Sequence, residues 1–203
     1  FGRGQTIMSK KDKWYAPHDS AEEQHFAWWL DDLEKKGLIY SRETQPTPFN
    51  LAGNVTFEMT TQLVTKVKTE TKTLEAGHIY TPDALVYFEK EMRPHINVVG
   101  QPTTKEKRNL PWCHEDGSYF KCWIEVKPSG YDKHNMLRLA KINQKWVYDK
   151  YGKMVNICKV GNVAGSFFDS TFTPQRYLKC DRTDRARKIN FSPRDVGTFL
   201  SLP

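Results

Sequence analysis

The sequence lacks long apolar runs, abundant cysteine and any glycine or proline repeat. No stretch approaches the roughly 18 uninterrupted apolar residues of a membrane-spanning helix, so we expect no membrane anchor. The basic residues Lys10, Lys11 and Lys13 are not followed by the apolar core of a signal peptide. The 4 cysteines are too few and too dispersed for a disulfide scaffold. We therefore expect reduced thiols and a cytoplasmic location, which is the host cytoplasm if the source is viral.

Aromatic residues and positive charge are what the sequence does contain. Its 6 Trp, 9 Tyr and 11 Phe supply enough apolar surface for a packed core, which excludes wholesale disorder. Its 31 Lys and Arg outnumber 24 Asp and Glu, so the formal net charge is +7. A basic excess interleaved with aromatic residues favours a polyanionic partner, most often nucleic acid.

Two regions have helical periodicity. Ser20 and Glu23 have the spacing of a capping box, and apolar residues recur behind them at helical intervals up to Gly37. This pattern predicts a helix over about 21–36. A second broad apolar stripe predicts a helix over about 133–150.

Strand patterns lie between and after these helices. Residues 66–73 alternate between charged side chains and Val or Thr, which predicts a strand with one solvated face. Residues 79–88, 122–127 and 154–160 are more apolar and are also expected to be strands. The order of the elements predicts an α/β fold with a mixed central β-sheet flanked by helices.

The chain divides into three segments on these patterns. Residues 1–19 are assigned to an N-terminal extension, 20–163 to the folded core, and 164–203 to a basic C-terminal extension. Within the core, residues 89–120 are polar and punctuated by proline and glycine, which predicts an insertion or a long loop.

Candidate chemistry lies at the ends of two expected strands. Glu125 and Lys127 are two residues apart in a strand, so their side chains point to the same face. Asp83, on a neighbouring strand, supplies a second carboxylate, and the Val126 carbonyl is a plausible third oxygen. Mg²⁺ and Mn²⁺ prefer such hard oxygen ligands. Glu23, in the first turn of the opening helix, is a candidate for a second metal or for orienting Lys127.

The Glu-x-Lys pattern alone is weak evidence. It occurs at Glu34, at Glu70 and at Glu125. Only Glu125 lies in an apolar strand, and burial of two charges there costs several kcal/mol unless they are paired or bound to metal.

Several motifs together resemble a known family. Pro82-Asp83, followed by Glu125-Val126-Lys127 and a helix, resembles the PD-(D/E)XK nuclease superfamily. Ser20-x-x-Glu23-x-x-Phe26-x-x-x-Leu30 is similar to the first helix of TnsA-type transposon endonucleases and of phage endonuclease I. Gln45-Pro46 is similar to a dipeptide that follows this helix in TnsA-like proteins. Tyr80-Thr81-Pro82-Asp83 resembles the aspartate motif of phage endonuclease I.

The resemblance covers about 20–160 and implies a restriction-endonuclease-like core. It implies Glu23, Asp83 and Glu125 as metal ligands, Lys127 as the catalytic lysine, Mg²⁺ or Mn²⁺ as cofactor, and hydrolysis of DNA phosphodiester bonds. A phage or mobile-element origin is the matching expectation. Two features depart from the family: a long separation between Asp83 and Glu125, and Pro128 where many relatives have glycine.

DNA is the expected partner, and a homodimer or recombination or packaging proteins are further candidates. The residues expected to contact DNA are basic or polar side chains after the lysine strand and in the C-terminal extension: Lys133, His134, Lys141, Lys145, Arg182, Arg185 and Arg187.

Three alternatives remain open from the sequence. One is a catalytically inactive DNA-binding or assembly protein on a nuclease-like fold, and another is a Holliday-junction resolvase. The third is a zinc site built from Cys113, His114 and Cys122 with Cys158, Cys180 or His134, although no Cys-x-x-Cys pair is present.

Overall fold

The computed structural model describes residues 14–103, 109–130, 135–183 and 185–202. Its helices and strands are α1 (Ala21–Glu34), β1 (Ile39–Thr44), β2 (Phe49–Ala52), β3 (Val55–Gln62), β4 (Val67–Glu75), β5 (His78–Tyr80), β6 (Ala84–Phe88), η2 (Lys90–His95), β7 (Asn97–Val98), β8 (Trp112–Asp116), β9 (Tyr119–Pro128), α2 (Asn135–Tyr151), β10 (Val155–Val160), α3 (Phe167–Ser170), η4 (Gln175–Leu178) and α4 (Val196–Leu200). Among these described residues, no helix is long and apolar enough to cross a membrane.

A mixed sheet forms the centre of the molecule, as the sequence predicted. Its strands run in the order β1-β6-β9-β8-β7, and β10 also pairs with β9. The long strand β9 joins antiparallel β6 along one edge. Its other edge is shared by antiparallel β8 near the start of β9 and by parallel β10 near its end. Helix α2 connects β9 to β10, as a parallel crossover requires.

The capping box at the start of α1 is confirmed. The Glu23 amide donates to Ser20 Oγ at 3.2 Å, and Ser20 Oγ donates to Glu23 Oε1 at 2.8 Å. The helix ends at Glu34, slightly before the expected end, and Gly37 follows in the left-handed region with φ 70°.

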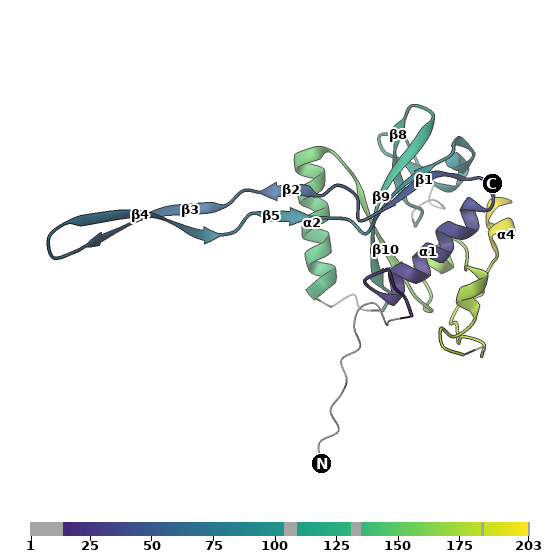
Figure 1. The fold of residues 1–203 in the computed structure, drawn as a ribbon. Coiled ribbons are helices and arrows are strands. Elements are labelled where there is room, and N and C mark those ends of the chain that lie inside the picture. The colour runs from purple at the N-terminus through teal and green to yellow at the C-terminus, as the bar shows by residue number, and fades with distance from the viewer. Residues whose placement is uncertain (1–13, 104–108, 131–134, 184, 203) are drawn as a thin grey trace, which may run out of the picture.

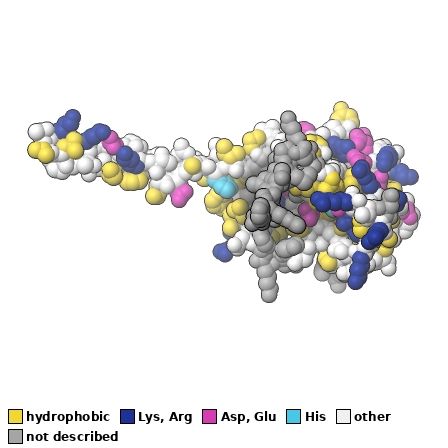
Figure 2. Space-filling model, turned by 60° about the horizontal axis from the view of Figure 1, so that its bottom comes forward, with side chains coloured by type: hydrophobic (Ala, Val, Ile, Leu, Met, Phe, Trp, Pro, Cys, Tyr) yellow, Lys and Arg dark blue, Asp and Glu magenta, His cyan; other side chains and the backbone are white. Residues whose placement is uncertain are grey.

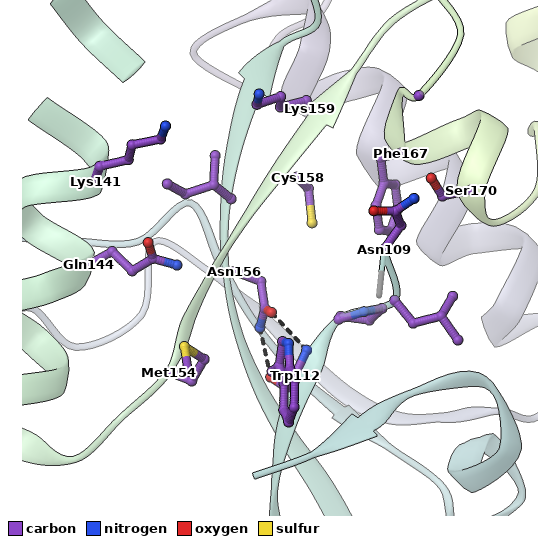
Figure 3. Close-up of a pocket in the computed structure, with 14 residues that line it drawn as sticks. Asn109, Trp112, Lys141, Gln144, Met154, Asn156, Cys158, Lys159, Phe167 and Ser170 are labelled. Atoms are coloured by element: carbon purple, nitrogen blue, oxygen red, sulfur yellow. Dashed lines mark hydrogen bonds between the residues drawn. The ribbon is translucent and has the colours of Figure 1, made fainter. Parts of the chain in front are cut away.

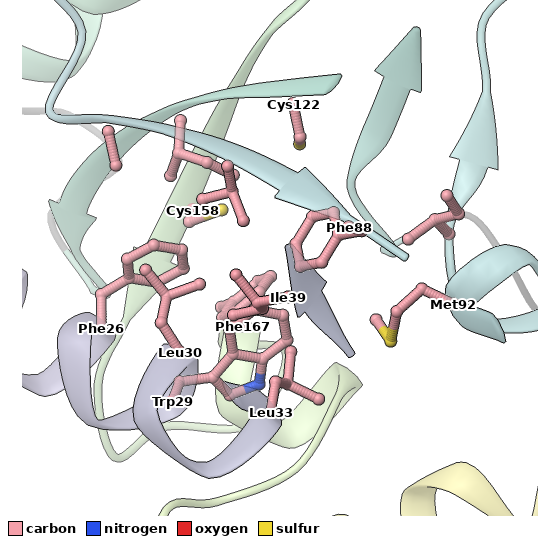
Figure 4. Packing of buried hydrophobic residues seen from close by; sticks show 14 of the residues in the cluster. Phe26, Trp29, Leu30, Leu33, Ile39, Phe88, Met92, Cys122, Cys158 and Phe167 are labelled. Carbon is pink, nitrogen blue, oxygen red and sulfur yellow. The ribbon is translucent and has the colours of Figure 1, made fainter. Parts of the chain in front are cut away.

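One face of the sheet is covered by α1 and by the C-terminal residues. Figure 4 shows Phe26, Trp29 and Leu30 of α1 packed with Phe167 beneath the strands. The Trp29 indole also donates to Thr171 Oγ1 at 3.1 Å. Residues after 164 therefore contribute to the same core as α1, through Phe167, Phe168, Phe172, Tyr177 and Phe199.

The opposite face of the sheet is covered by α2 and by the strand pair β2-β5. A smaller apolar cluster forms there, made of Leu51, Tyr80, Leu85, Trp123, Val147 and Val155. Alternation along β9 divides its side chains between the two faces: Ile124 and Val126 belong to the α1 side, and Trp123 belongs to the α2 side.

Strands β3 and β4 form an arm that projects away from the body of the molecule (Figure 1). We use "arm" for residues 55–75. Every residue of β3 is exposed, and every residue of β4 is exposed except the half-buried Glu70. The prediction of a strand was correct, but the prediction of a single solvated face was wrong, because nothing packs on either face.

Two further expectations need correction. The expected strand over 79–88 is interrupted at 81–83, and its halves pair with different partners, β5 with β2 and β6 with β1 and β9. The long loop expected over 89–120 is wrong in part, because this segment contains η2, β7 and β8, and β8 is hydrogen-bonded into the central sheet. Its local composition favours turns, whereas sheet pairing gives it strand structure.

Candidate active site

The interruption between β5 and β6 places Asp83 beside β9. The β6-β9 ladder ends with Ala84 opposite Ile124, so Asp83 lies one residue beyond the ladder. There the Val126 amide donates to Asp83 Oδ2 at 2.6 Å. The Gln45 amide donates to the Asp83 carbonyl at 3.1 Å, which fixes the backbone of the aspartate from the β1 side.

Glu125 and Lys127 lie side by side on β9, as the two-residue spacing predicted. Lys127 Nζ is 2.5 Å from Glu125 Oε1. The Tyr80 hydroxyl donates to the other carboxylate oxygen, Glu125 Oε2, at 2.8 Å. Tyr80 therefore holds one oxygen of Glu125 and leaves the other directed to the lysine.

The Lys127 ammonium gathers the three oxygens that the sequence predicted as metal ligands. Besides Glu125, Nζ donates to the Val126 carbonyl at 3.0 Å and lies 4.0 Å from Asp83 Oδ2. The side chains of Lys127 and Glu125 are only 14% and 10% exposed, so these charges are largely removed from water. The arrangement is a cation held by two carboxylates and one carbonyl.

Electrostatics at this point are unfavourable for two carboxylates. Burial and, as the second cause, the negative charge of Glu125 together raise the pKa of Asp83 to about 7. The hydrogen bond from the Val126 amide and the charge of Lys127 oppose this increase. The pKa of Tyr80 is raised by burial and by the same carboxylate, so Tyr80 remains a hydrogen-bond donor. A site that concentrates negative charge in this way favours a bound cation.

Oxygen donors of this kind fit a hard divalent cation. Two carboxylates and a main-chain carbonyl are the usual protein ligands of Mg²⁺, which keeps several of its waters. The contact of the ammonium with all three groups is the observation that shows them to be directed to one point. Asp83, Glu125 and the Val126 carbonyl are therefore the residues that would hold such an ion.

Glu23 is close to this cluster but is not in contact with it. Its carboxylate is engaged at the helix start, where it accepts from Ser20 Oγ and from the Asp19 amide. It nevertheless lines, with Asp83 and Val126, a cavity of about 340 Å³ between α1 and the sheet, and its charge raises the pKa of Asp83. The structure thus brings three of the four predicted catalytic residues together, and Glu23 shares its cavity with Asp83 but not with Glu125 or Lys127.

No described group of three or more His, Cys, Asp or Glu side chains is arranged to hold a metal ion. This finding covers the zinc alternative as well as the three acidic residues, within the described ranges. Cys113, Cys122 and Cys158 are buried free thiols, and burial raises the pKa of Cys122 and Cys158.

The residues predicted to bind DNA are placed differently from one another. Lys133 and His134 lie outside the described residues. Lys145 is exposed on α2. Lys141, also on α2, borders a second cavity of about 450 Å³, which Figure 3 shows between α2, β10 and the C-terminal residues, with Lys159 and Gln144 on its wall.

The C-terminal arginines divide into exposed and internal groups. Arg182 and Arg185 are exposed. Arg187 points inward: its guanidinium pairs with Asp181, donates to the Tyr177 carbonyl at 2.8 Å and lies over the Tyr177 ring. Arg187 therefore holds the C-terminal residues together.

Two residues of the site were given no role by the sequence argument. Tyr80 orients Glu125, and the available signal was its position three residues before Asp83. Gln45 adopts a φ of 49°, which is uncommon for a residue with a side chain, while it holds Asp83 and donates from Nε2 to Asp19 Oδ2 at 3.0 Å. The proline after Gln45 indicated an irregular backbone, but not this contact.

No protein-family model, curated protein or solved structure matches the chain.

Proposed function

We propose that this protein is a divalent-metal-dependent DNA endonuclease with a restriction-endonuclease-like core. The observation that carries the proposal is the set of Lys127 contacts, in which one ammonium is held by Glu125, Asp83 and the Val126 carbonyl. A scaffold gains nothing in stability from two carboxylates crowded at a strand end, so a function is the better explanation. The net charge of +7 agrees with a polyanionic substrate.

In this proposal the residues of the chain have distinct tasks. Asp83 and Glu125, with the Val126 carbonyl, would hold Mg²⁺ or Mn²⁺. When bound, the ion supplies a polarised water and neutralises charge on the scissile phosphate. Lys127 then turns from Glu125 toward the phosphate, where it orients the attacking water or stabilises the developing negative charge. Tyr80 keeps Glu125 oriented, and in-line displacement leaves a 3′-hydroxyl and a 5′-phosphate.

The proposal is tested by incubating plasmid, linear duplex and four-way-junction DNA with the protein in Mg²⁺, Mn²⁺ or a chelator. We expect cleavage with either ion and none with the chelator. Lys127→Ala should abolish cleavage while circular dichroism reports a folded protein. The matched control is Lys36→Ala, which alters the exposed lysine of another Glu-x-Lys sequence and should cleave normally.

One of two further results would contradict the assignment, and the other would narrow the substrate. Unchanged cleavage by Lys127→Ala would exclude Lys127 from the chemistry. Preferential cutting of the four-way junction would favour a resolvase within the same chemistry.

A second candidate function follows from the same contacts. Because Lys127 already forms ion pairs with both carboxylates, the cluster is also compatible with an inactive DNA-binding or assembly protein that retains the nuclease scaffold. That protein would bind DNA with strong salt dependence and produce no strand breaks with any divalent ion.

A further inference from the structure

The arm has no packing partner within the described part of its own chain that would explain its stability. A two-stranded hairpin without a packing partner is only marginally stable in water. Here eight residue pairs extend the hairpin away from the body, and apolar side chains such as Phe57, Met59 and Val64 are exposed on it. Neither strand pairs with any further strand among the described residues, so both outer edges present free backbone donors and acceptors.

The charge of the arm argues against DNA as its partner. The arm contains three lysines and three glutamates, so its net charge is zero in a chain whose total is +7. In the view of Figure 2, basic, acidic and apolar side chains are interspersed along it. A surface that follows a phosphate backbone needs an excess of positive charge.

The charges of β4, in contrast, complement a second copy of β4. Lys68, Glu70 and Lys72 alternate with threonines, so the three charged side chains lie on one face of the ribbon. Glu70 pairs with Lys68 and, at 2.8 Å, with Lys72 in the same strand. Strand β4 thus presents a row of alternating charge next to its free edge.

We propose that the protein forms a two-fold homodimer in which the β4 edges of two copies pair antiparallel, with Thr71 on the symmetry axis. In this register Glu70 of each copy lies opposite Lys72 of the other, and Thr69 lies opposite Thr73. The two arms then form one four-stranded sheet. The proposal does not rest on the nuclease assignment.

Other registers of the same edge are less favourable. Placing Glu70 on the axis sets glutamate against glutamate and Lys68 against Lys72. Placing Thr69 on the axis also sets Lys68 against Glu70, but it sets Lys66, just before the strand, against Lys72, so two opposite-charge pairs are offset by two like-charge pairs. The edge of β3 has no such complementarity, because its one charged residue, Glu58, has no lysine to face in a second β3. Cross-strand pairs of opposite charge stabilise a sheet and like charges destabilise it, so the register centred on Thr71, which has no like-charge pair, is favoured.

Cysteine cross-linking tests the register. The Thr71→Cys variant is made in a Cys180→Ser background. The Cys180→Ser change removes the one native thiol that is not buried. Paired residues in antiparallel strands lie about 4.5–5.5 Å apart at Cα, which suits a disulfide. We expect Thr71→Cys to form a covalent dimer under mild oxidation. Thr69→Cys, whose two copies would be about 13 Å apart, should not form one alone, but should do so when mixed with Thr73→Cys.

Charge exchange between copies tests complementarity independently. Glu70→Lys alone and Lys72→Glu alone each set like charges across the axis, so each should raise the dimer dissociation constant about tenfold in analytical ultracentrifugation. A mixture of the two variants restores both opposite-charge pairs in the heterodimer and should dimerise like the original chain. If the two substitutions acted only on the ion pairs within one arm, mixing the two variants would not restore dimerisation.

Three outcomes would overturn the proposal. The first is a chain that remains monomeric at the highest concentration at which it is soluble. The second is a dimer that neither charge variant weakens, or one that Thr69→Cys alone cross-links. The third is a monomer whose DNA affinity rises with Glu70→Lys and falls with Lys72→Glu, which would assign the arm to nucleic acid instead. None of these measurements requires cleavage, so failure here is separate from failure of the proposed function.

Discussion

The same three-residue pattern occurs in two regions with opposite surroundings. Glu125-Val126-Lys127 lies in the central strand of a sheet covered on both faces, and Glu70-Thr71-Lys72 lies in the exposed arm. Both pairs form ion pairs, but the Glu125 and Lys127 side chains are 10% and 14% exposed, whereas those of Glu70 and Lys72 are 33% and 45% exposed. Local sequence spacing is identical, so the difference lies entirely in what packs around each pair.

The difference in burial makes the Glu125–Lys127 pair a candidate functional site and the Glu70–Lys72 pair an ordinary surface ion pair. In the arm, water screens the pair, and its contribution to stability within one chain is small. In the sheet, desolvation makes each charge depend on its partners, and Asp83, Tyr80 and the Val126 carbonyl complete the set. The following predictions test that contrast, from the largest expected effect to the smallest.

Neutralising the buried glutamate should have the largest effect, on activity. Glu125→Gln keeps the shape of the side chain but removes one carboxylate from the proposed metal site. We expect cleavage with Mg²⁺ to fall about 10³-fold or more, measured by single-turnover kinetics. Glu34→Gln is the matched control, because Glu34 is exposed and pairs with Arg42 on the surface. An equal loss in both variants would remove the distinction between the two environments.

Removing the buried lysine should have the next largest effect, on stability. Lys127→Met leaves Glu125 without its cation, and we expect a loss of about 2–4 kcal/mol in the free energy of unfolding, measured with urea. Combining it with Glu125→Gln should recover most of this loss, because no unpaired charge remains. Lys72→Met in the arm should barely move the unfolding midpoint. Similar shifts from Lys127→Met and Lys72→Met would show that burial does not distinguish the pairs.

Asp83→Asn should stabilise the metal-free protein at high pH. The pKa of Asp83 is raised to about 7 in the folded protein, above its ordinary value of 3.8, so the aspartate destabilises the fold as pH rises through about 7. Asparagine can still accept from the Val126 amide. In chelator, the variant should exceed the original chain by about 2–4 kcal/mol at pH 8 and lose that advantage toward pH 4. If the difference in the free energy of unfolding between the two proteins does not change with pH, ionisation of Asp83 does not destabilise the fold and the prediction is wrong.

Tyr80→Phe should have the smallest effect. It removes the hydroxyl that donates to Glu125 Oε2 and leaves the ring in its apolar cluster. We expect a loss of about 1 kcal/mol in the free energy of unfolding and a modest decrease in cleavage. Tyr40→Phe, which changes an exposed tyrosine that stacks on Tyr119, serves as the control. A gain in stability from Tyr80→Phe would contradict the role given to its hydroxyl.

Sequence patterns predicted well wherever the deciding contacts are local. The Ser20–Glu23 capping box formed as expected because its atoms are three residues apart. The common direction of Glu125 and Lys127 followed from strand alternation. The exposure of both arm faces did not follow, because alternation at 66–73 is equally compatible with a covered face, and only the absence of a neighbouring element decides.

Contacts between residues that are far apart in the sequence could not be predicted from local sequence patterns. Asp83 reaches Val126 only because β6 and β9 pair in one register and the strand over 79–88 is interrupted at its middle. Glu23 was predicted to join the site, but its carboxylate is held by Ser20 and Asp19, since both roles compete for the same oxygens. The strand β8 was missed because its composition favours turns and its structure depends on pairing with β9.

By itself, the sequence determined the helix start, the strand periodicity, the basic charge and the identity of the side chains available for chemistry. The tertiary structure decided which Glu-x-Lys pair is buried, which carboxylates share one cation, and which strand edge remains free. The physical reason is that propensity and alternation act over a few residues, whereas desolvation and strand register depend on segments that lie far apart in the chain.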